Sequence, residues 1–320
     1  MFTRRQFMIR SLVSAAAVAS LSGCSCRQTL KMAIHPWIGY EPIYLAEDFG
    51  LLPHEISLMK GHNASESIQR LKSGEVGAAA LTLDEVLRAR NQGVALTVVL
   101  VFDSSAGADM LLTRPDIFDL IQLKGKRIGY ERSAVGELMM SKALQTAGLQ
   151  ETDVIRVNLS PDRQVKAWKS NEVDAVITYE PTASLLKDLG AKMLFDSRQI
   201  PETIFDVLAV KTDVLENCPT VIKELVKADF DALVRMNTNL GDAIYRIANH
   251  ENILPNDIKS ALRGVILPSL ATNRNYLRRG SSFYRAAQTL NELMYEKGMI
   301  SRLDDFNKLL SNRYLPEDNV

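Results

Sequence analysis

KSGEVGAAA at residues 72–80 and KSNEVDAVITYE at residues 169–180 repeat Lys, Ser, Glu, Val and Ala in register. Each copy predicts the end of a helix, a turn through Gly74 or Asn171, and a buried strand of small and β-branched residues. A chance match of short segments is the alternative to a duplication. Similar elements flank both copies and favour duplication, so the sequence predicts one structural unit used in two lobes.

Short apolar strands alternate with amphipathic helices around both copies. Strands are expected at 30–36, 55–60, 76–82 and 95–102, and again at 126–130, 154–159, 173–179 and 192–195. This alternation is typical of βαβ units and parallel sheets. From Pro219 onward the apolar residues follow helical spacing, which predicts a helical C-terminal tail.

The first residues, MFTRRQFMIRSLVSAAAVASLSGC at 1–24, have the features of an export signal. Arg4 and Arg5 form a basic start, and the Ala-rich apolar stretch that follows is too short to span a bilayer. Residues 3–8 also resemble the twin-arginine export motif, so general secretion and twin-arginine export both stay open.

The residues LSGC at 21–24 resemble the bacterial lipobox. We expect cleavage before Cys24 and lipid attachment to its thiol, where several acyl chains such as palmitate together give durable anchoring. A plain signal peptide with a chance cysteine is the alternative. The predicted organisation is a signal peptide at 1–23 and a lipidated tether at 24–29, followed by the folded body.

The composition is that of a folded exported body. Of 320 residues, 46% are hydrophobic and 24% charged, with a formal net charge of zero, so no basic field predicts a nucleic-acid partner. A chain of this length is expected to form two lobes. With Cys24 lipidated, Cys26 and Cys218 remain, and the sequence leaves open whether they pair in the export compartment.

Ligands of open parallel sheets bind beyond the carboxyl ends of the strands, where loops and helix N-termini converge. In this chain those positions are occupied by the loops at 35–40, 81–84, 131–134 and 179–181. The sequence therefore predicts a binding cleft lined by both lobes.

Three segments carry a family resemblance: HPWIGYEPIYLAEDFGLL at 35–52, GADMLL at 107–112 and VDAVITYEP at 173–181. Together they resemble the substrate-binding proteins of the ABC importers for nitrate, sulfonates, taurine and thiamine precursors. The resemblance covers about residues 30–210. It implies an α/β periplasmic-binding-protein fold of the second type, with two lobes that each hold a mainly parallel sheet flanked by helices.

The resemblance also implies where the lobes begin and end. We expect residues 30–107 and 206–320 in lobe 1 with the helical tail, residues 108–205 in lobe 2, and crossings near Phe102–Leu112 and Phe205–Val210. Closure about these crossings would bury a ligand between the lobes.

The resemblance, carried over by position, implies an aromatic wall at Trp37 and Tyr40 and hydroxyl groups at Thr82 and Ser133. The backbone N–H at Ala134 would add a partial positive pole for an anion. The other candidate ligand-binding residues are His35, Asp84, Glu180 and Asp206.

Each candidate also has a purely structural interpretation. Trp37 could pack against Pro42 or Tyr44, and His35 could be a satisfied core histidine, since His54, His62 and His250 lack metal-ligand spacing. Thr82 and Ser133 could be helix N-caps. Glu180 could be a solvated turn residue and Asp206 a hinge anchor.

Acidic residues dominate the loops expected at the cleft. Asp84, Glu131, Glu180 and Asp206 lie on them, whereas Arg132 is the main cation. A buried carboxylate beside an anion is unfavourable, so a nitrate-type site is disfavoured. The pattern predicts a ligand with an amine or amidine, which fits a taurine-like zwitterion or an aminopyrimidine better than nitrate, within a class that also includes sulfonates.

We therefore expect an exported, lipid-anchored monomer on the periplasmic side of the cell envelope. It would capture a small molecule and deliver it to an ABC permease in the inner membrane. The sequence leaves open the ligand and whether the anchor lies in the inner or the outer membrane.

Two other classes of function are alternatives. A sensory binding protein, which would dock on a membrane receptor, fits the same features. An enzyme on the same fold is disfavoured, because G-x-S-x-G, P-loop, G-x-G-x-x-G and Cys/His metal patterns are missing, as is the cysteine-rich motif of thiamine-pyrimidine synthases. No catalytic residue, metal or cofactor is expected.

Overall fold

The computed structural model describes residues 29–317. The predicted signal peptide, the lipidation site Cys24 and the neighbouring Cys26 lie outside these residues. Cys218 is disulfide-bonded, and the question of its pairing with Cys26 therefore also falls outside the described part of the chain. None of the helices between residues 29 and 317 has both the length and the apolar character needed to cross a bilayer.

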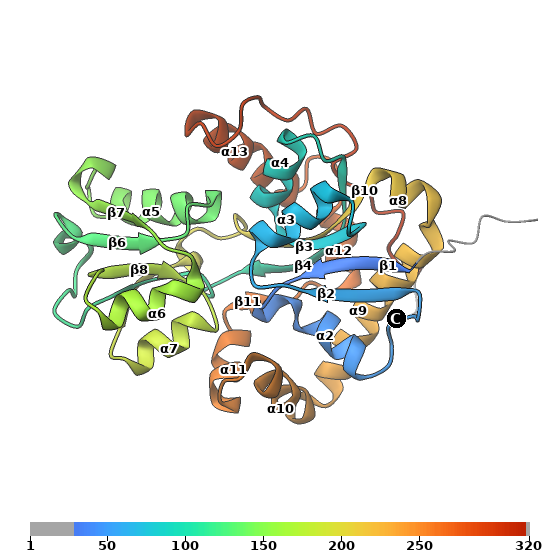
Figure 1. The fold of residues 1–320 in the computed structure, drawn as a ribbon, viewed down its shortest axis with the longest axis horizontal. Helices are drawn as coiled ribbons and strands as arrows, with labels where there is room; N and C mark the ends of the chain where they lie inside the picture. Colours follow the sequence, from blue (N-terminus) through green and yellow to red (C-terminus); the bar gives the residue numbers. More distant parts are fainter. Residues whose placement is uncertain (1–28, 318–320) are drawn as a thin grey trace, which may run out of the picture.

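Two mixed β-sheets form the centres of two lobes that lie side by side (Figure 1). The first sheet has the order β11-β4-β10-β3-β1-β2, and the second has the order β7-β6-β8-β5-β9. The strands of the first are β1 (Leu30–Ile34), β2 (Ile56–Lys60), β3 (Ala78–Thr82), β4 (Leu96–Ser105), β10 (Phe205–Lys211) and β11 (Val265–Ile266). The strands of the second are β5 (Met110–Thr113), β6 (Arg127–Tyr130), β7 (Ile155–Asn158), β8 (Ala175–Thr178) and β9 (Lys192–Asp196).

The sequence repeat forms equivalent strands in the two sheets. β1 pairs in parallel with β2 and β3, and β6 pairs in parallel with β7 and β8, so the order β2-β1-β3 matches β7-β6-β8. The turns before β3 and β8 pass through Gly74 at φ 76° and Asn171 at φ 58°. Both turns are left-handed, and a position after a helix end favours glycine or asparagine for this reason.

Each sheet also contains an antiparallel strand at its crossing between lobes. The first crossing follows Ser105 and lies inside the predicted Phe102–Leu112. The second precedes Phe205, because Phe205–Val210 pair with both β3 and β4 as strand β10. The prediction of a crossing at Phe205–Val210 was therefore wrong by a few residues: these side chains are buried in the first sheet.

Helices cover both faces of the two sheets (Figure 1). Around the strands lie α2 (Glu41–Asp48), α3 (Ala64–Ser73), α4 (Leu83–Asn91), α5 (Ala134–Thr146), α6 (Pro161–Lys169) and α7 (Thr182–Asp188). The tail contains α8 (Thr212–Asn217), α9 (Pro219–Thr238), α10 (Leu240–Glu251), α11 (Pro255–Leu262), α12 (Leu270–Tyr276) and α13 (Ser282–Glu296). Within it, α9 packs on α2 of the first lobe, and α13 contacts both α4 and α5.

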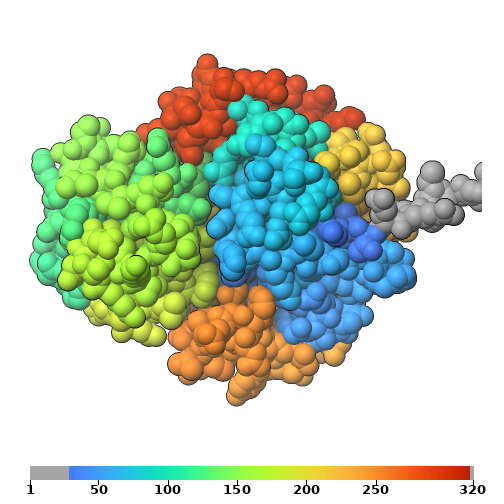
Figure 2. Space-filling model, in the orientation of Figure 1, coloured from blue at the N-terminus to red at the C-terminus, as the bar shows by residue number. Residues whose placement is uncertain are grey.

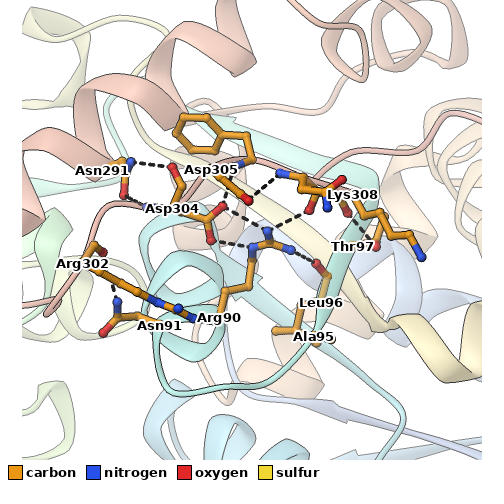
Figure 3. A network of polar contacts seen from close by, with 12 residues as sticks. Arg90, Asn91, Ala95, Leu96, Thr97, Asn291, Arg302, Asp304, Asp305 and Lys308 are labelled. Carbon is orange, nitrogen blue, oxygen red and sulfur yellow. Dashed lines mark hydrogen bonds and ion pairs between the residues drawn. The ribbon is translucent and has the colours of Figure 1, made fainter.

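The end of the tail is fixed to the first sheet through Arg90 of α4 (Figure 3). Its guanidinium donates to both carboxylate oxygens of Asp304, at 2.7 and 3.0 Å, and to the backbone carbonyls of Leu96 and Asn307. Thr97 donates to the carbonyl of Lys308 at 2.8 Å. One side chain thereby joins α4, β4 and the C-terminal segment.

We expect Arg90→Ala to lower the free energy of unfolding by about 2–3 kcal/mol, because the Asp304 carboxylate and two carbonyls lose a charged donor. Urea denaturation followed by circular dichroism measures the change. Arg278→Ala, at an exposed position, is the matched control and should change stability by less than about 0.5 kcal/mol. Equal stability of the two variants would contradict this role for Arg90.

Candidate functional site

A cavity of about 50 Å³ lies between the lobes. His35 after β1 and Thr82 at the end of β3 reach it from the first lobe, and Glu131 after β6 and Thr178 at the end of β8 reach it from the second. The cavity therefore lies at the carboxyl ends of the parallel strands, as predicted. In the space-filling view the two lobes meet along a seam (Figure 2). Pockets for drug-sized ligands measure roughly 300–1,000 Å³, so this one suits a solute of few heavy atoms.

Aromatic rings from both lobes face each other in the cavity wall. Trp37 and Tyr179 meet edge to face, with ring centroids 5.3 Å apart. The indole N–H of Trp37 donates to Asp103 Oδ2 at 2.9 Å. Gly39 is required beside this bond, because a Cβ there would lie 1.8 Å from Asp103 Oδ2.

Tyr40 lies behind the cavity wall and positions Asp206. Its hydroxyl donates to Asp206 Oδ1 at 2.6 Å, and its ring packs edge-on against His35. The other oxygen, Asp206 Oδ2, is buried without a hydrogen-bond partner among the described residues. Burial, with help from the nearby Asp103, raises the pKa of Asp206 well above its usual range.

Four carboxyl groups line the cavity: those of Glu85, Asp109, Glu131 and Asp206. No arginine or lysine is among the described residues that line it. Burial raises the pKa of Glu85 to about 8 and that of Asp109 to about 6, and it also raises the pKa of Glu131. The carboxyl groups of the cavity are therefore partly protonated near neutral pH. A cationic group beside them would favour their ionised form.

Five buried polar atoms at the cavity have no hydrogen-bond partner within residues 29–317: His35 Nδ1, Asp109 Oδ2, Gln164 Oε1, Thr178 Oγ1 and Asp206 Oδ2. The amide nitrogen of Gln164 donates to the carbonyls of Leu159 and Ile177, and its oxygen is the atom left over. Buried polar atoms normally find partners. Three of the five are acceptors when the carboxyl groups are ionised, so a donor-rich ligand complements them.

The start of α5 supplies the cavity with hydrogen-bond donors. Ser133 is the N-cap and accepts from the N–H of Gly136 at 3.1 Å. The N–H of Ala134 donates across the interface between the lobes to Asp84 Oδ2 at 2.9 Å. Val135 lines the cavity, and its N–H is among the donors that a helix start leaves without an intrahelical partner.

Five of the sequence candidates line the cavity, namely His35, Trp37, Thr82, Ser133 and Asp206. The remaining four, Tyr40, Asp84, Ala134 and Glu180, lie outside its lining.

Glu180 is held by helix α7, which begins two residues after it. Its carboxylate accepts from the N–H of Ser184 at 2.9 Å and lies 3.3 Å from Lys187 Nζ. Glu180 is buried, so the alternative interpretation of Glu180 as a solvated turn residue is wrong. Arg132, expected as the main cation of the cleft, is exposed and outside the lining.

Several lining residues were not among the sequence candidates. Thr178 and Tyr179 end a predicted strand, so the strand-end rule could have found them. Asp109 lies within the GADMLL segment, so the family resemblance of that segment could have identified it as a candidate site residue. Gln164 sits inside helix α6, where the sequence pattern gives no signal.

Comparison with known proteins gives a family and a fold. The model of the family described as NMT1/THI5 like matches residues 41–235. The taurine-binding periplasmic protein of Escherichia coli (strain K12) is 27% identical over 176 residues, which are 54% of this chain and 55% of that protein. The chain thus spans about half the length of the curated relatives it matches.

Two solved structures show the shared fold over nearly the whole chain. The periplasmic aliphatic sulphonate binding protein SsuA of Escherichia coli has a TM-score of 0.75 at 19% identity, covering 90% of this chain and 99% of that one. The alkanesulfonate-binding protein SsuA of Xanthomonas axonopodis pv. citri, bound to MOPS, has a TM-score of 0.70 at 17% identity, covering 85% and 94%.

The Asp84 carboxylate is predicted to hold the lobes together in the absence of ligand. Asp84→Ala removes the acceptor for the Ala134 N–H, and a charged hydrogen bond of this kind is worth about 1.5–3 kcal/mol. We expect the ratio of open to closed molecules to rise at least about tenfold, which small-angle X-ray scattering would detect as a larger radius of gyration.

Asp84→Asn keeps an acceptor oxygen at the same place and is the matched control, expected to stay closer to the wild type. If Asp84→Ala and the wild type gave the same scattering curve without ligand, the bond would have no role in closure.

Proposed function

Because this chain belongs to the NMT1/THI5-like family, we propose that it is an exported solute-binding protein that captures a small zwitterion between its lobes and delivers it to an ABC importer. The observation that carries the proposal is the cavity lining: four carboxyl groups, with no lysine or arginine among the described lining residues.

The acidic part of the cavity would take an ammonium group. Asp206 Oδ2 and Asp109 Oδ2 are buried and unpartnered among the described residues, and Gln164 Oε1 offers a third acceptor. An ammonium carries three donors, which matches these three acceptors in number. Its positive charge would also offset the cost of ionising carboxyl groups that burial keeps protonated.

The opposite, anionic end of the ligand would bind at the start of α5. Val135, Ser133 and Thr82 line the cavity, and a helix N-terminus favours negative charge. The Val135 N–H and the Ser133 hydroxyl would be the donors, because the Thr82 hydroxyl already donates to Asp84. The taurine-binding and sulfonate-binding relatives support a sulfonate at this end. The ligand class proposed is therefore a small amino-sulfonate.

Delivery completes the proposal. Ligand contacts from both lobes would favour the closed form, which a permease recognises. The export signal and the lipobox at Cys24 support a body tethered to a membrane on the periplasmic side, with residues 30–107 and 206–320 in one lobe and 108–205 in the other. This tethered form is expected to be a monomer.

Isothermal titration calorimetry should show one taurine bound per chain, and ethanesulfonate, which lacks the amine, bound at least about tenfold more weakly. Asp206→Asn should lower the affinity for taurine about 10- to 100-fold, because it removes one charge-assisted contact. It should leave the affinity for ethanesulfonate nearly unchanged.

Asp213→Asn is the control, since Asp213 is an exposed aspartate that is not among the lining residues. Ethanesulfonate or nitrate bound more tightly than taurine would refute the acidic-site assignment. If an aminopyrimidine binds to the wild type and not to Asp206→Asn, the acidic site would still hold the cationic group of the ligand. The ligand would then be an aminopyrimidine and not an amino-sulfonate.

The affinity for taurine should fall as the pH decreases from about 7 to 5. Burial raises the pKa of Asp109 to about 6, and its ionised form binds an ammonium, so below that pH each ligand must displace a proton. The affinity then falls by up to about tenfold per pH unit. Titrations across this range test the trend, and Asp109→Asn should flatten it; an affinity for taurine that is independent of pH would contradict the role of Asp109.

A further inference from the structure

A second cluster of ligand-type side chains lies outside the cavity, between α2 and α10. Glu41 is the first residue of α2, and His250 and Glu251 are the last two residues of α10. One donor atom from each residue lies within 4.8 Å of the other two. His250 Nδ1 is 2.8 Å from Glu41 Oε1 and 3.9 Å from Glu251 Oε1.

The two carboxyl groups of this cluster are buried and incompletely bonded. The side chains of Glu41 and Glu251 are 1% and 3% exposed. Within the described chain, no group donates a hydrogen bond to Glu41 Oε2 or Glu251 Oε1. The two carboxyl groups also lie close enough to each other to share a proton. Buried carboxyl groups in this state call for a proton or a cation.

A small cavity adjoins the cluster. It measures about 20 Å³ and is lined by Glu41 and His250 together with Tyr44, Asp48 and Lys60. A space of roughly 10–15 Å³ on this measure accepts one water molecule. The cavity therefore has room for one water beside a bound ion, and no room for an organic ligand.

From this convergence of donors, we propose that Glu41, His250 and Glu251 bind a divalent transition-metal ion, with Zn²⁺ as the probe. One imidazole nitrogen and two carboxylate oxygens are a ligand set that suits Zn²⁺, and a water in the adjoining cavity would be the fourth ligand. Ca²⁺ and Mg²⁺ prefer oxygen ligands throughout and fit the imidazole less well. The C-terminal end of α10 adds a negative pole that favours a cation.

The surrounding charges are compatible with a cation. Lys60 and Arg246 border the small cavity, but Lys60 pairs with Glu47 at 2.7 Å, and Arg246 pairs with Asp242 at 2.8 Å and approaches Asp48 at 3.9 Å.

From the second lobe, the Glu180 side chain lies near enough to Glu251 to interact with it electrostatically. The acidic groups around the cluster thus outnumber the basic ones.

The bound ion would stabilise the packing of α10 on α2. Glu41 directly follows Tyr40, which positions Asp206 at the main cavity. A metal that joins Glu41 to the end of α10 would fix α10 against α2 and support the loop that precedes α2.

The test titrates Zn²⁺ into the full chain after treatment with EDTA, without any organic ligand, and records heat and thermal unfolding. We expect one tightly bound ion per chain and a higher Tm with Zn²⁺. His250→Gln and Glu251→Gln should each lower the Zn²⁺ affinity at least about tenfold, while Mg²⁺ should not compete. His54→Gln is the matched control, because the side chain of His54 is 93% exposed.

Co²⁺ provides a second readout that does not depend on stability. Its visible absorption should change on binding to the wild type and to His54→Gln, and should lose that change in His250→Gln. Asp206→Asn should keep the Zn²⁺ site, which separates this cluster from the acidic cavity and from the proposed solute. Three results would each overturn the proposal: loss of the ion in Asp206→Asn, full Zn²⁺ affinity in His250→Gln, or no bound ion in the wild type. The last result would leave a proton shared by Glu41 and Glu251 as the group that joins the two carboxylates.

Discussion

The hydrogen bond from Tyr40 to Asp206 fixes the loop after the first strand to the strand by which the chain re-enters the first lobe. A second bond, from Trp37 to Asp103, fixes the same loop to β4, the strand by which the chain leaves that lobe. Asp103 and Asp206 are cross-strand partners in the pairing of β4 with β10. Like charges opposite each other are destabilising, and burial raises the pKa of Asp103 to about 8. Protonation and the hydrogen bonds from Trp37 and Tyr40 thus allow Asp103 and Asp206 to face each other beneath the cavity. The cavity wall depends on these two pairs.

Much of this arrangement could be predicted from local pattern. The repeated Lys-Ser segment located β3 and β8, and the strand-end rule brought His35, Trp37, Thr82, Ser133 and Asp206 to one place, because carboxyl ends of parallel strands share an edge. Side-chain direction could not be predicted in this way. Tyr40 and Asp84 lie on the expected loops, yet they point to partners inside the protein, as the bonds to Asp206 and Ala134 show.

The crossing strands and the second cluster show a further limit. In the sequence, β10 is a mostly apolar run that contains Asp206. Only its pairing with β3 and β4 shows that it is a strand within the first sheet. Glu41 and His250 are 209 positions apart, so no spacing motif connects them. The contact between Asp84 and α5 is of the same long-range kind. It places a carboxylate of the protein at a helix start suited to an anion, so a ligand that needs the Ala134 N–H must compete with a group already present there.

The two sheets also differ in how much of the chain each requires. The strands of the second sheet all lie between Met110 and Asp196, whereas the first sheet combines β1 to β4 with β10 and β11, and Val98 of β4 bridges to Leu310. Strand pairing over such separations is slow, because loop closure precedes the gain from contacts. As the chain emerges in order during synthesis, the second sheet can complete while the first still lacks its central strand β10. The lobe that supplies Glu85 and Asp206 to the cavity is therefore the last to assemble, and it needs both ends of the described chain to do so.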